Sequence, residues 1–398
     1  MAKNKFLSYG RQTIDPADVR EISKALSADC ITRGPKVEAF EKALRKQCEA
    51  KYAVVFSNGT VALHAAYYAA QVGEFDRIFT SPNTFVGTVT GGILLGANLE
   101  LLDIDRGTGH LDLKALNQAM LKQYSRGRNI IVPVHYSGSV VDMKSLESCI
   151  RDPDTVIIED AAQALGADYS DGTPVGSCQW SQMTVFSFHP LKTITTGEGG
   201  AVTTNDPELY KRLVRFRNNG IERNPENWDY PEEAGPWYYE VHDLTGNYHM
   251  TDFQAVLGLS QLSRMKKYVT KRRKLVALYR KAFAEHKHIR LLDANLDKHS
   301  AHHLFVIQLD FRRLPLSKIE LMEVLKEKDI GTQVHYIPIY RHPFFRRLLG
   351  DCREKFPEME RFYSDALTLP LFPDMREGDV RRVVDTVCEL LEMSTAVV

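Results

Sequence analysis

The amino-acid sequence predicts an α/β protein with a large domain on a mostly parallel sheet, followed by a smaller C-terminal α+β domain. Between residues 53 and 206, short apolar segments typical of strands alternate with stretches typical of helices, which indicates parallel strands with helices on both faces. The chain has 398 residues, more than one simple core usually holds. We therefore expect residues 1–250 to form the large domain with an N-terminal lead-in, and residues 251–398 to form a connecting helix and the small domain.

The first elements are expected in the lead-in and the large domain. Asp15 and Pro16 begin a helix that reaches Leu26, and Pro35 opens a second helix. Strands are expected at residues 54–56, 77–80, 99–102, 130–134, 156–158 and 183–188. Residues 199–204 would add an antiparallel strand to the same sheet.

Beyond the sheet, residues 217–247 show little periodicity and many aromatic residues, which predicts a long functional loop. A helix is expected from Met250, continuing as a charged stretch up to His286. The small domain is expected to contain strands at residues 303–309 and 332–335, and helices at 317–328, 357–368 and 377–392.

Composition narrows the functional class. The formal net charge is zero, which argues against broad binding of nucleic acid or of an anionic membrane. The six cysteines are scattered without CxxC spacing, which favours reduced thiols in a cytoplasmic protein over disulfides or a zinc site. The sequence shows no signal-peptide pattern, no apolar run of membrane-spanning length and no HExxH motif, so we expect neither a membrane anchor nor a metal.

The first candidate site residue is Lys192, in the segment Ser187-Phe-His-Pro-Leu-Lys192-Thr-Ile-Thr-Thr-Gly197. Strand residues precede this segment and a glycine-rich turn follows it, so Lys192 is expected on a tight loop at a strand end. A lysine held in a partly apolar loop can lose its proton and become the amine that forms a Schiff base. Taken alone, Lys192 would be interpreted as an ordinary solvated lysine.

The second candidate is Asp160, which ends the run Thr155-Val-Ile-Ile-Glu-Asp160. This run predicts a buried parallel strand with a carboxylate at its C-terminal edge. Glu159 and Asp160 could instead cap a helix that follows. Together, a buried carboxylate and a Schiff-base lysine are the two protein groups that a pyridoxal phosphate (PLP) site needs, because the lysine holds the aldehyde and the acid keeps the ring nitrogen protonated.

Two further segments suit this cofactor. A strand at residues 53–56 enters a polar turn with Gly59 and Thr60 before a helix, and the free amides of a helix start attract phosphate. An ordinary strand-to-helix turn would have the same pattern. Phe85, in the turn Ser81-Pro-Asn-Thr-Phe85, could stack on a flat ring or could be a core residue.

As an ordered set, these motifs resemble the DegT/DnrJ/EryC1/StrS family of nucleotide-sugar aminotransferases, which implies the PLP-dependent transferase fold type I of aspartate aminotransferase. The resemblance covers nearly the whole chain, including Ile31-Thr-Arg-Gly-Pro, Pro133-Val-His-Tyr-Ser-Gly138 and Leu369-Pro-Leu-Phe-Pro373. Gly235-Pro-Trp-Tyr-Tyr-Glu240 and Gln333-Val-His-Tyr-Ile-Pro338 are similar to the PseC-type branch, which aminates C4 of a UDP-linked 4-keto-6-deoxy-N-acetylhexosamine. Packing at a subunit interface would also explain these two aromatic loops.

The resemblance implies a role for each site residue. Lys192 would hold the cofactor and move the Cα proton, and Asp160 would pair with the ring nitrogen. Cofactor contacts are implied for Gly59, Thr60, Phe85, Gln163, Ser187 and, from a partner subunit, Asn247. Sugar-nucleotide contacts are implied for Tyr9, Thr32, Arg33, Gly34, His189, His335 and Tyr336. An amino-acid donor such as L-glutamate, a homodimer with shared active sites and a bacterial surface amino sugar such as pseudaminic acid follow from the same resemblance.

The sequence departs from the family pattern at one motif, and three other functions are compared with the PseC-type reaction. The family commonly has Gly-Tyr-Asn-Tyr-Arg where this chain has Thr245-Gly-Asn-Tyr-His249, so the contacts of that arginine are in question. An aminotransferase for a dTDP- or GDP-linked 3- or 4-ketosugar would share every motif near Lys192. The family's dehydratase branch carries histidine in place of the lysine, so Lys192 argues against it. A non-catalytic regulator or scaffold on the same fold would not need to keep Lys192 and Asp160.

Overall fold

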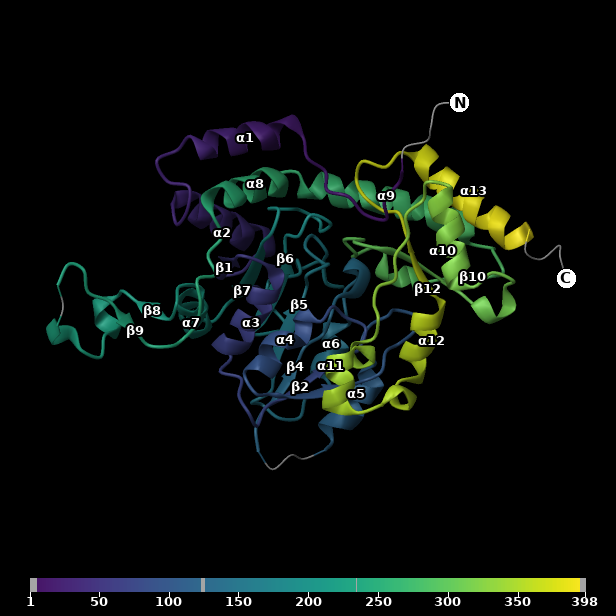
Figure 1. Cartoon of the computed structure of the whole chain (residues 1–398). Helices are drawn as coiled ribbons and strands as arrows, with labels where there is room; N and C mark the ends of the chain where they lie inside the picture. The colour runs from purple at the N-terminus through teal and green to yellow at the C-terminus, as the bar shows by residue number, and fades with distance from the viewer. Residues whose placement is uncertain (1–5, 123–125, 234, 394–398) are drawn as a thin grey trace.

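A seven-stranded sheet lies at the centre of the computed structural model, which describes residues 6–122, 126–233 and 235–393 (Figure 1). The strand order is β1-β7-β6-β5-β4-β2-β3. Its strands are β1 (Tyr52–Phe56), β2 (Arg77–Thr80), β3 (Asn98–Leu101), β4 (Asn129–Ile131), β5 (Val156–Asp160), β6 (Met183–Ser187) and β7 (Gly200–Thr204). Neighbouring strands are parallel except at β7, which is antiparallel to both β1 and β6. The antiparallel strand expected at residues 199–204 is therefore confirmed.

Helices cover both faces of this sheet. The helices α3 (Gly59–Ala69), α4 (Gly87–Leu94) and α7 (Pro207–Arg217) pack on one face. The helices α2 (Pro35–Cys48), α5 (Leu113–Met120), α6 (Met143–Glu147) and α8 (Asp252–Leu262) pack on the other. Each face of the sheet has its own hydrophobic core, because successive side chains of a strand point to opposite faces. On β1, Val54 and Phe56 pack against α3, α4 and α7, whereas Ala53 and Val55 belong to the core on the other face.

The lead-in helix, α8 and the helix that follows α8 lie along the top of the view in Figure 1. The lead-in helix α1 (Pro16–Leu26) packs on α8, and Asp15 caps it by accepting hydrogen bonds from the amides of Ala17 and Asp18. The continuous helix expected from Met250 to His286 is wrong, because α8 ends at Leu262 and α9 (Met265–Phe283) begins after a break. Among the described residues, no helix is both long enough and apolar enough to span a bilayer.

The C-terminal part contains a three-stranded antiparallel sheet of β10 (Ile289–Leu291), β11 (Phe305–Leu309) and β12 (Ala366–Leu369). Its core also includes side chains of α9, α10 (Lys318–Glu327) and α13 (Glu377–Met393). Two short helices, α11 (Pro343–Leu349) and α12 (Pro357–Asp365), lie between α10 and β12 in the chain. The domain boundary at residue 250 stays a prediction.

Two expectations for the C-terminal part are wrong, and one helix was missed. The strand expected at residues 332–335 is absent from this described segment, where Gln333 makes only a single bridge to Thr368. The helix expected at 357–368 ends at Asp365, because the next four residues pair with β11. The helix α11 was not expected, although Pro343 at its start is a helix-opening residue.

The described residues between 217 and 247 form an arm that projects from the large sheet at the left of Figure 1. A short hairpin of β8 (Ile221–Glu222) and β9 (Glu240–Val241) organises the arm. Glu240 is buried and accepts hydrogen bonds from the amides of Asp229 and Tyr230, each at 2.7 Å. The expected loop is therefore folded, while Trp237, three residues before Glu240, is 78% exposed.

Candidate active site

Lys192 lies on the loop that joins β6 to the antiparallel β7. The Lys192 amide donates to the carbonyl of His189 at 2.9 Å, and the Thr195 hydroxyl donates to the carbonyl of Phe188 at 3.1 Å. Gly197 closes the loop with φ of +80°, a conformation that favours glycine. These bonds hold Lys192 at the end of β6, beside the end of β5.

Asp160 ends β5 with its side chain buried. Its carboxylate accepts a hydrogen bond from the Thr88 hydroxyl at 2.6 Å and from the Ala162 amide at 3.1 Å. The Thr84 hydroxyl lies 2.6 Å from that of Thr88 and must donate to it, because Thr88 gives its proton to Asp160. The alternative that the acids at this position cap a helix is wrong, because in the described chain β5 runs into turns and then β6. The partner Thr88 was missed, and only its place at the start of the helix that follows β2 could have indicated it.

Lys192 and Asp160 interact electrostatically. Burial lowers the pKa of Lys192 to about 8, and the negative charge of Asp160 opposes this shift. A substantial fraction of the Lys192 amine is therefore neutral near neutral pH, which is the state that a nucleophile needs.

Four other predicted residues meet next to this pair. The Gln163 amide donates to the Tyr336 hydroxyl at 2.6 Å, and its oxygen accepts from the Ser137 amide at 2.6 Å. The Tyr9 and His335 rings lie 5.3 Å apart. Burial lowers the pKa of His335 to about 4, with the charge of Lys192 adding to the effect, so this imidazole is neutral.

A groove of about 700 Å³ opens beside these residues. Tyr9, His335 and Tyr336 line it, together with Phe85 and apolar residues of α4 and α11. Phe85 is 57% exposed and its ring centre lies 6.4 Å from that of Tyr336, so the interpretation of Phe85 as a core residue is wrong. His189 is exposed on the Lys192 loop and does not belong to the described lining of the groove.

The turn before α3 lies in close contact with Ser187 at the end of β6 and with Gly200 at the start of β7. A Cβ atom on Gly59 would lie 2.9 Å from the Cβ of Ser187, so only glycine fits without displacing this strand end. Asn58 caps α3 by accepting from the Val61 amide at 2.9 Å. The amides of Gly59 and Thr60 belong to the first helical turn, where no intrahelical acceptor exists, and Thr60 is exposed. This donor set, the Lys192 amine and the Asp160 carboxylate suit the phosphate, aldehyde and ring nitrogen of PLP.

The remaining predicted residues lie elsewhere in the chain. The Gly34 amide donates to Asp252 at 2.6 Å and Thr32 bridges to Thr251, so the segment around exposed Arg33 sits where α2 and α8 begin. These residues are not in the described lining of the groove. Asn247 is exposed on a strand segment that bridges to Asn218.

His249, which stands where the family commonly has arginine, is partly buried and lies 3.1 Å from the Asn218 side-chain oxygen. Burial lowers the pKa of His249 to about 4, and the charges of Arg217 and Arg33 add to the effect. His249 is therefore neutral near pH 7 and does not replace the missing positive charge.

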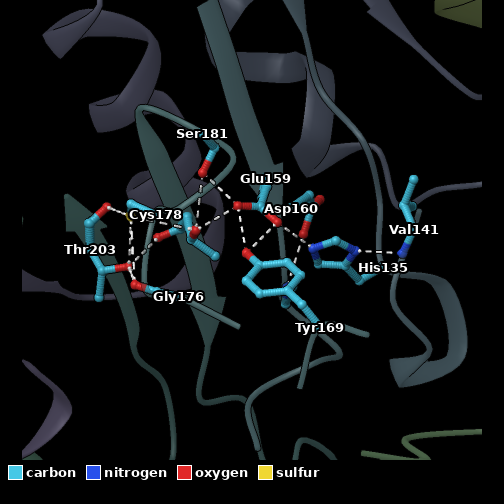
Figure 2. Close-up of polar contacts among 11 residues, drawn as sticks. His135, Val141, Glu159, Asp160, Tyr169, Gly176, Cys178, Ser181 and Thr203 are labelled. Atoms are coloured by element: carbon cyan, nitrogen blue, oxygen red, sulfur yellow. Dashed lines mark hydrogen bonds and ion pairs between the residues drawn. The ribbon is translucent and has the colours of Figure 1, made fainter. Parts of the chain in front are cut away.

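A second polar cluster lies behind Asp160 and centres on Glu159, which is fully buried (Figure 2). The Glu159 carboxylate accepts hydrogen bonds from His135 at 2.8 Å, from the Tyr169 hydroxyl at 2.7 Å, and from Ser181 and Thr184. Burial by itself raises the pKa of Glu159, but the hydrogen bonds, led by that from His135, outweigh burial and lower it. Sequence reasoning missed this cluster.

The sheet, the lysine loop and the carboxylate at the end of β5 define a PLP-dependent transferase of fold type I. The chain belongs to the DegT/DnrJ/EryC1/StrS aminotransferase family, whose model matches residues 12–388. It is therefore a sugar-nucleotide aminotransferase, its cofactor is PLP, and its substrates are a nucleotide sugar and an amino donor. The expected family, fold type and cofactor are confirmed.

Three relatives place the chain within this family. It is 34% identical to the UDP-4-amino-4,6-dideoxy-N-acetyl-beta-L-altrosamine transaminase of Campylobacter jejuni, covering 97% of this chain and 98% of the relative. The solved structure of Helicobacter pylori PseC, an aminotransferase involved in the biosynthesis of pseudoaminic acid, matches with a TM-score of 0.88 and 27% identity, covering 98% of this chain and 100% of that one. A putative sugar aminotransferase from Streptococcus pneumoniae, in its PLP form, matches with a TM-score of 0.85 and 25% identity, covering 99% and 100%.

Proposed function

We propose that this enzyme transfers the amino group of L-glutamate to C4 of a UDP-linked 4-keto-6-deoxy-N-acetylhexosamine, in the cytoplasm and on a route to a surface amino sugar such as pseudaminic acid. The observation that carries the proposal is that the low-pKa Lys192 and the buried Asp160 interact electrostatically with His335 and Tyr336, respectively, which line the groove. The names of the C. jejuni and H. pylori relatives support the choice of substrate.

On the cofactor side, PLP supplies the electron sink for the reacting carbon when it is bound. In this proposal Lys192 holds the cofactor and then, as a neutral amine, accepts and returns the substrate proton. Asp160, fixed by Thr88, faces the ring nitrogen as an anion. The remaining contacts are proposed as follows: Gly59, Thr60 and Ser187 bind the phosphate, Phe85 covers the ring, and Gln163 uses its second amide proton near the ring oxygen.

On the sugar-nucleotide side, Tyr9, His335 and Tyr336 line the groove and would contact the sugar or the base. His189 would approach the sugar from the Lys192 loop. Arg33 would pair with the diphosphate, with Thr32 and Gly34 shaping its loop.

We also propose a homodimer with shared active sites. The segment at residues 32–34 lies where α2 and α8 begin, outside the groove of its own chain, and Asn247 is exposed. Both are therefore available to contact a cofactor or nucleotide bound by a second copy of the chain. Asn247 would then reach the phosphate of the partner's cofactor.

A single-turnover experiment tests the reaction. The protein is loaded with pyridoxamine phosphate (PMP) and mixed with a UDP-4-keto-6-deoxy-N-acetylhexosamine, while absorbance follows the cofactor and mass spectrometry follows the sugar. We expect conversion of the cofactor to PLP with formation of an aminated UDP-sugar, and loss of both in Lys192→Ala. Turnover only with dTDP- or GDP-linked ketosugars would overturn the proposed substrate but keep the reaction. PMP binding without turnover of any ketosugar would favour a scaffold.

A further inference from the structure

The hydrogen bonds around Glu159 determine the charge of each group in its network. His135 Nδ1 accepts a hydrogen bond from the Val141 amide at 3.2 Å, so this nitrogen carries no proton and Nε2 donates to Glu159 (Figure 2). The other contacts come from the hydroxyl groups of Tyr169, Ser181 and Thr184. All groups in the described chain that bond to this carboxylate are therefore neutral donors.

The position of Glu159 makes the negative charge of its carboxylate relevant to the candidate active site. Side chains alternate along a strand, so Glu159 and Asp160 leave β5 on opposite faces of the sheet. Glu159 is fully buried, and the field of a buried charge is little screened by solvent. An anion one residue from Asp160 therefore adds to the negative potential at the end of β5.

The network also connects two cofactor-facing residues mechanically. His135 holds Glu159 with its ring, while its backbone amide donates to the Asp160 carbonyl at 3.0 Å. Two residues further along, the Ser137 amide donates to the Gln163 side chain at 2.6 Å. The segment from His135 to Ser137, after β4, thus holds both the end of β5 and the side-chain amide of Gln163. Glu159 in turn holds this segment through its hydrogen bond to the His135 ring.

We propose that Glu159 is a positioning residue for the cofactor, which orients Asp160 and Gln163 through His135 and whose negative charge adds to that of Asp160 in favouring the protonated ring nitrogen. This inference rests on the proposed function, because it concerns residues that would face bound PLP or PMP. Glu159 is fully buried on the opposite face of the sheet from Asp160, so its effect must be measured through the cofactor's own properties.

The first test is the dissociation constant of PMP, measured by fluorescence titration of the apoprotein, because PMP binds without a covalent bond to Lys192. Glu159→Gln removes the charge and turns an amide donor toward His135 and Tyr169. We expect PMP to bind at least about tenfold more weakly and kcat to fall, while KM for the sugar nucleotide stays within about twofold. The pH midpoint of the bound-cofactor absorbance should also move to lower pH, because the protonated ring nitrogen is less favoured.

Two further variants separate positioning from general stability. Tyr169→Phe keeps the charge of Glu159, removes one hydrogen-bond donor to it, and should weaken PMP binding about threefold or more. If Glu159→Gln does not fold, the PMP affinity of Tyr169→Phe decides whether the network positions the cofactor. Asp76→Asn is the matched control, since Asp76 is also a buried carboxylate held by amides and by Arg128, but it precedes β2 at the opposite end of the strands. It should lower Tm and leave the PMP dissociation constant unchanged.

The outcomes are distinct. If Glu159→Gln and Tyr169→Phe lower Tm as Asp76→Asn does, but bind PMP with wild-type affinity and the wild-type pH midpoint, Glu159 is only structural and the inference is overturned. If the wild-type protein binds PMP and aminates the sugar while the variants are unaffected, the proposed function stands without the inference. If the wild-type protein binds no PMP, both are overturned.

Discussion

The Lys192 amine should react with an aldehyde near neutral pH, because burial lowers its pKa to about 8. At about pH 7.5, roughly a quarter of such an amine is neutral, compared with roughly one in a thousand for a lysine of ordinary pKa. The reactive fraction is therefore roughly 200-fold larger than for a free lysine side chain. Because the pKa is lowered, the neutral form is gained as the pH rises through about 8, well before an ordinary lysine titrates.

The assay mixes apoprotein with PLP between about pH 6 and pH 10 and measures the rate of the absorbance change. Nα-acetyllysine, run in parallel, corrects for the ionisation of PLP itself. The corrected rate should rise roughly tenfold per pH unit below about pH 8 and then level off. In Asp160→Asn the plateau should begin at lower pH, because the charge that opposes the shift is gone. A wild-type rate that keeps rising up to about pH 10, or persists in Lys192→Ala, would refute the reasoning.

Three further substitutions test the turn before α3, the groove and the small-domain core. Gly59→Ala should weaken PMP binding about tenfold, because its Cβ would lie 2.9 Å from the Cβ of Ser187; unchanged affinity would contradict the close fit. Tyr336→Phe removes the acceptor of the Gln163 amide and should lower kcat severalfold in steady-state assays, and an unchanged kcat would exclude that role. Leu325→Ala should lower the free energy of unfolding in urea by about 2–5 kcal/mol, and a loss below about 1 kcal/mol would mean that the core refills the cavity.

Much of the fold and part of the site could be predicted because the signals are local. The run that ends in Asp160 and the loop that carries Lys192 are each coded by consecutive residues, a strand followed by its turn. Parallel pairing then brings the ends of β5 and β6 to one edge of the sheet without further information. The two residues could therefore be placed near each other from the sequence, whereas their chemical roles stay predictions.

The failures share a physical cause, which is dependence on distant partners. Residues 366–369 continue a helical pattern, but they form β12 because β11 offers a free edge. The donors to Glu159 come from segments around His135, Tyr169 and Ser181, and no spacing rule connects them. The segment Pro133-Val-His-Tyr-Ser-Gly138 was noted as a motif, but its contact with Glu159 exists only in the folded chain.

The strand order also has a consequence for biosynthesis of the enzyme. In the described sheet β1 has β7 as its only hydrogen-bonded neighbour, and Tyr52 pairs with Thr204 (Figure 1). The ribosome therefore releases β1 and the turn at Gly59 long before β7, the strand with which β1 pairs. Pairing β1 with β7 closes a loop of the whole intervening chain, which is slow. In a nascent chain that has not yet exposed Thr204, the turn that we propose binds the cofactor phosphate is not yet held by the sheet, so we expect the cofactor to stabilise the enzyme only after β7 has joined the sheet.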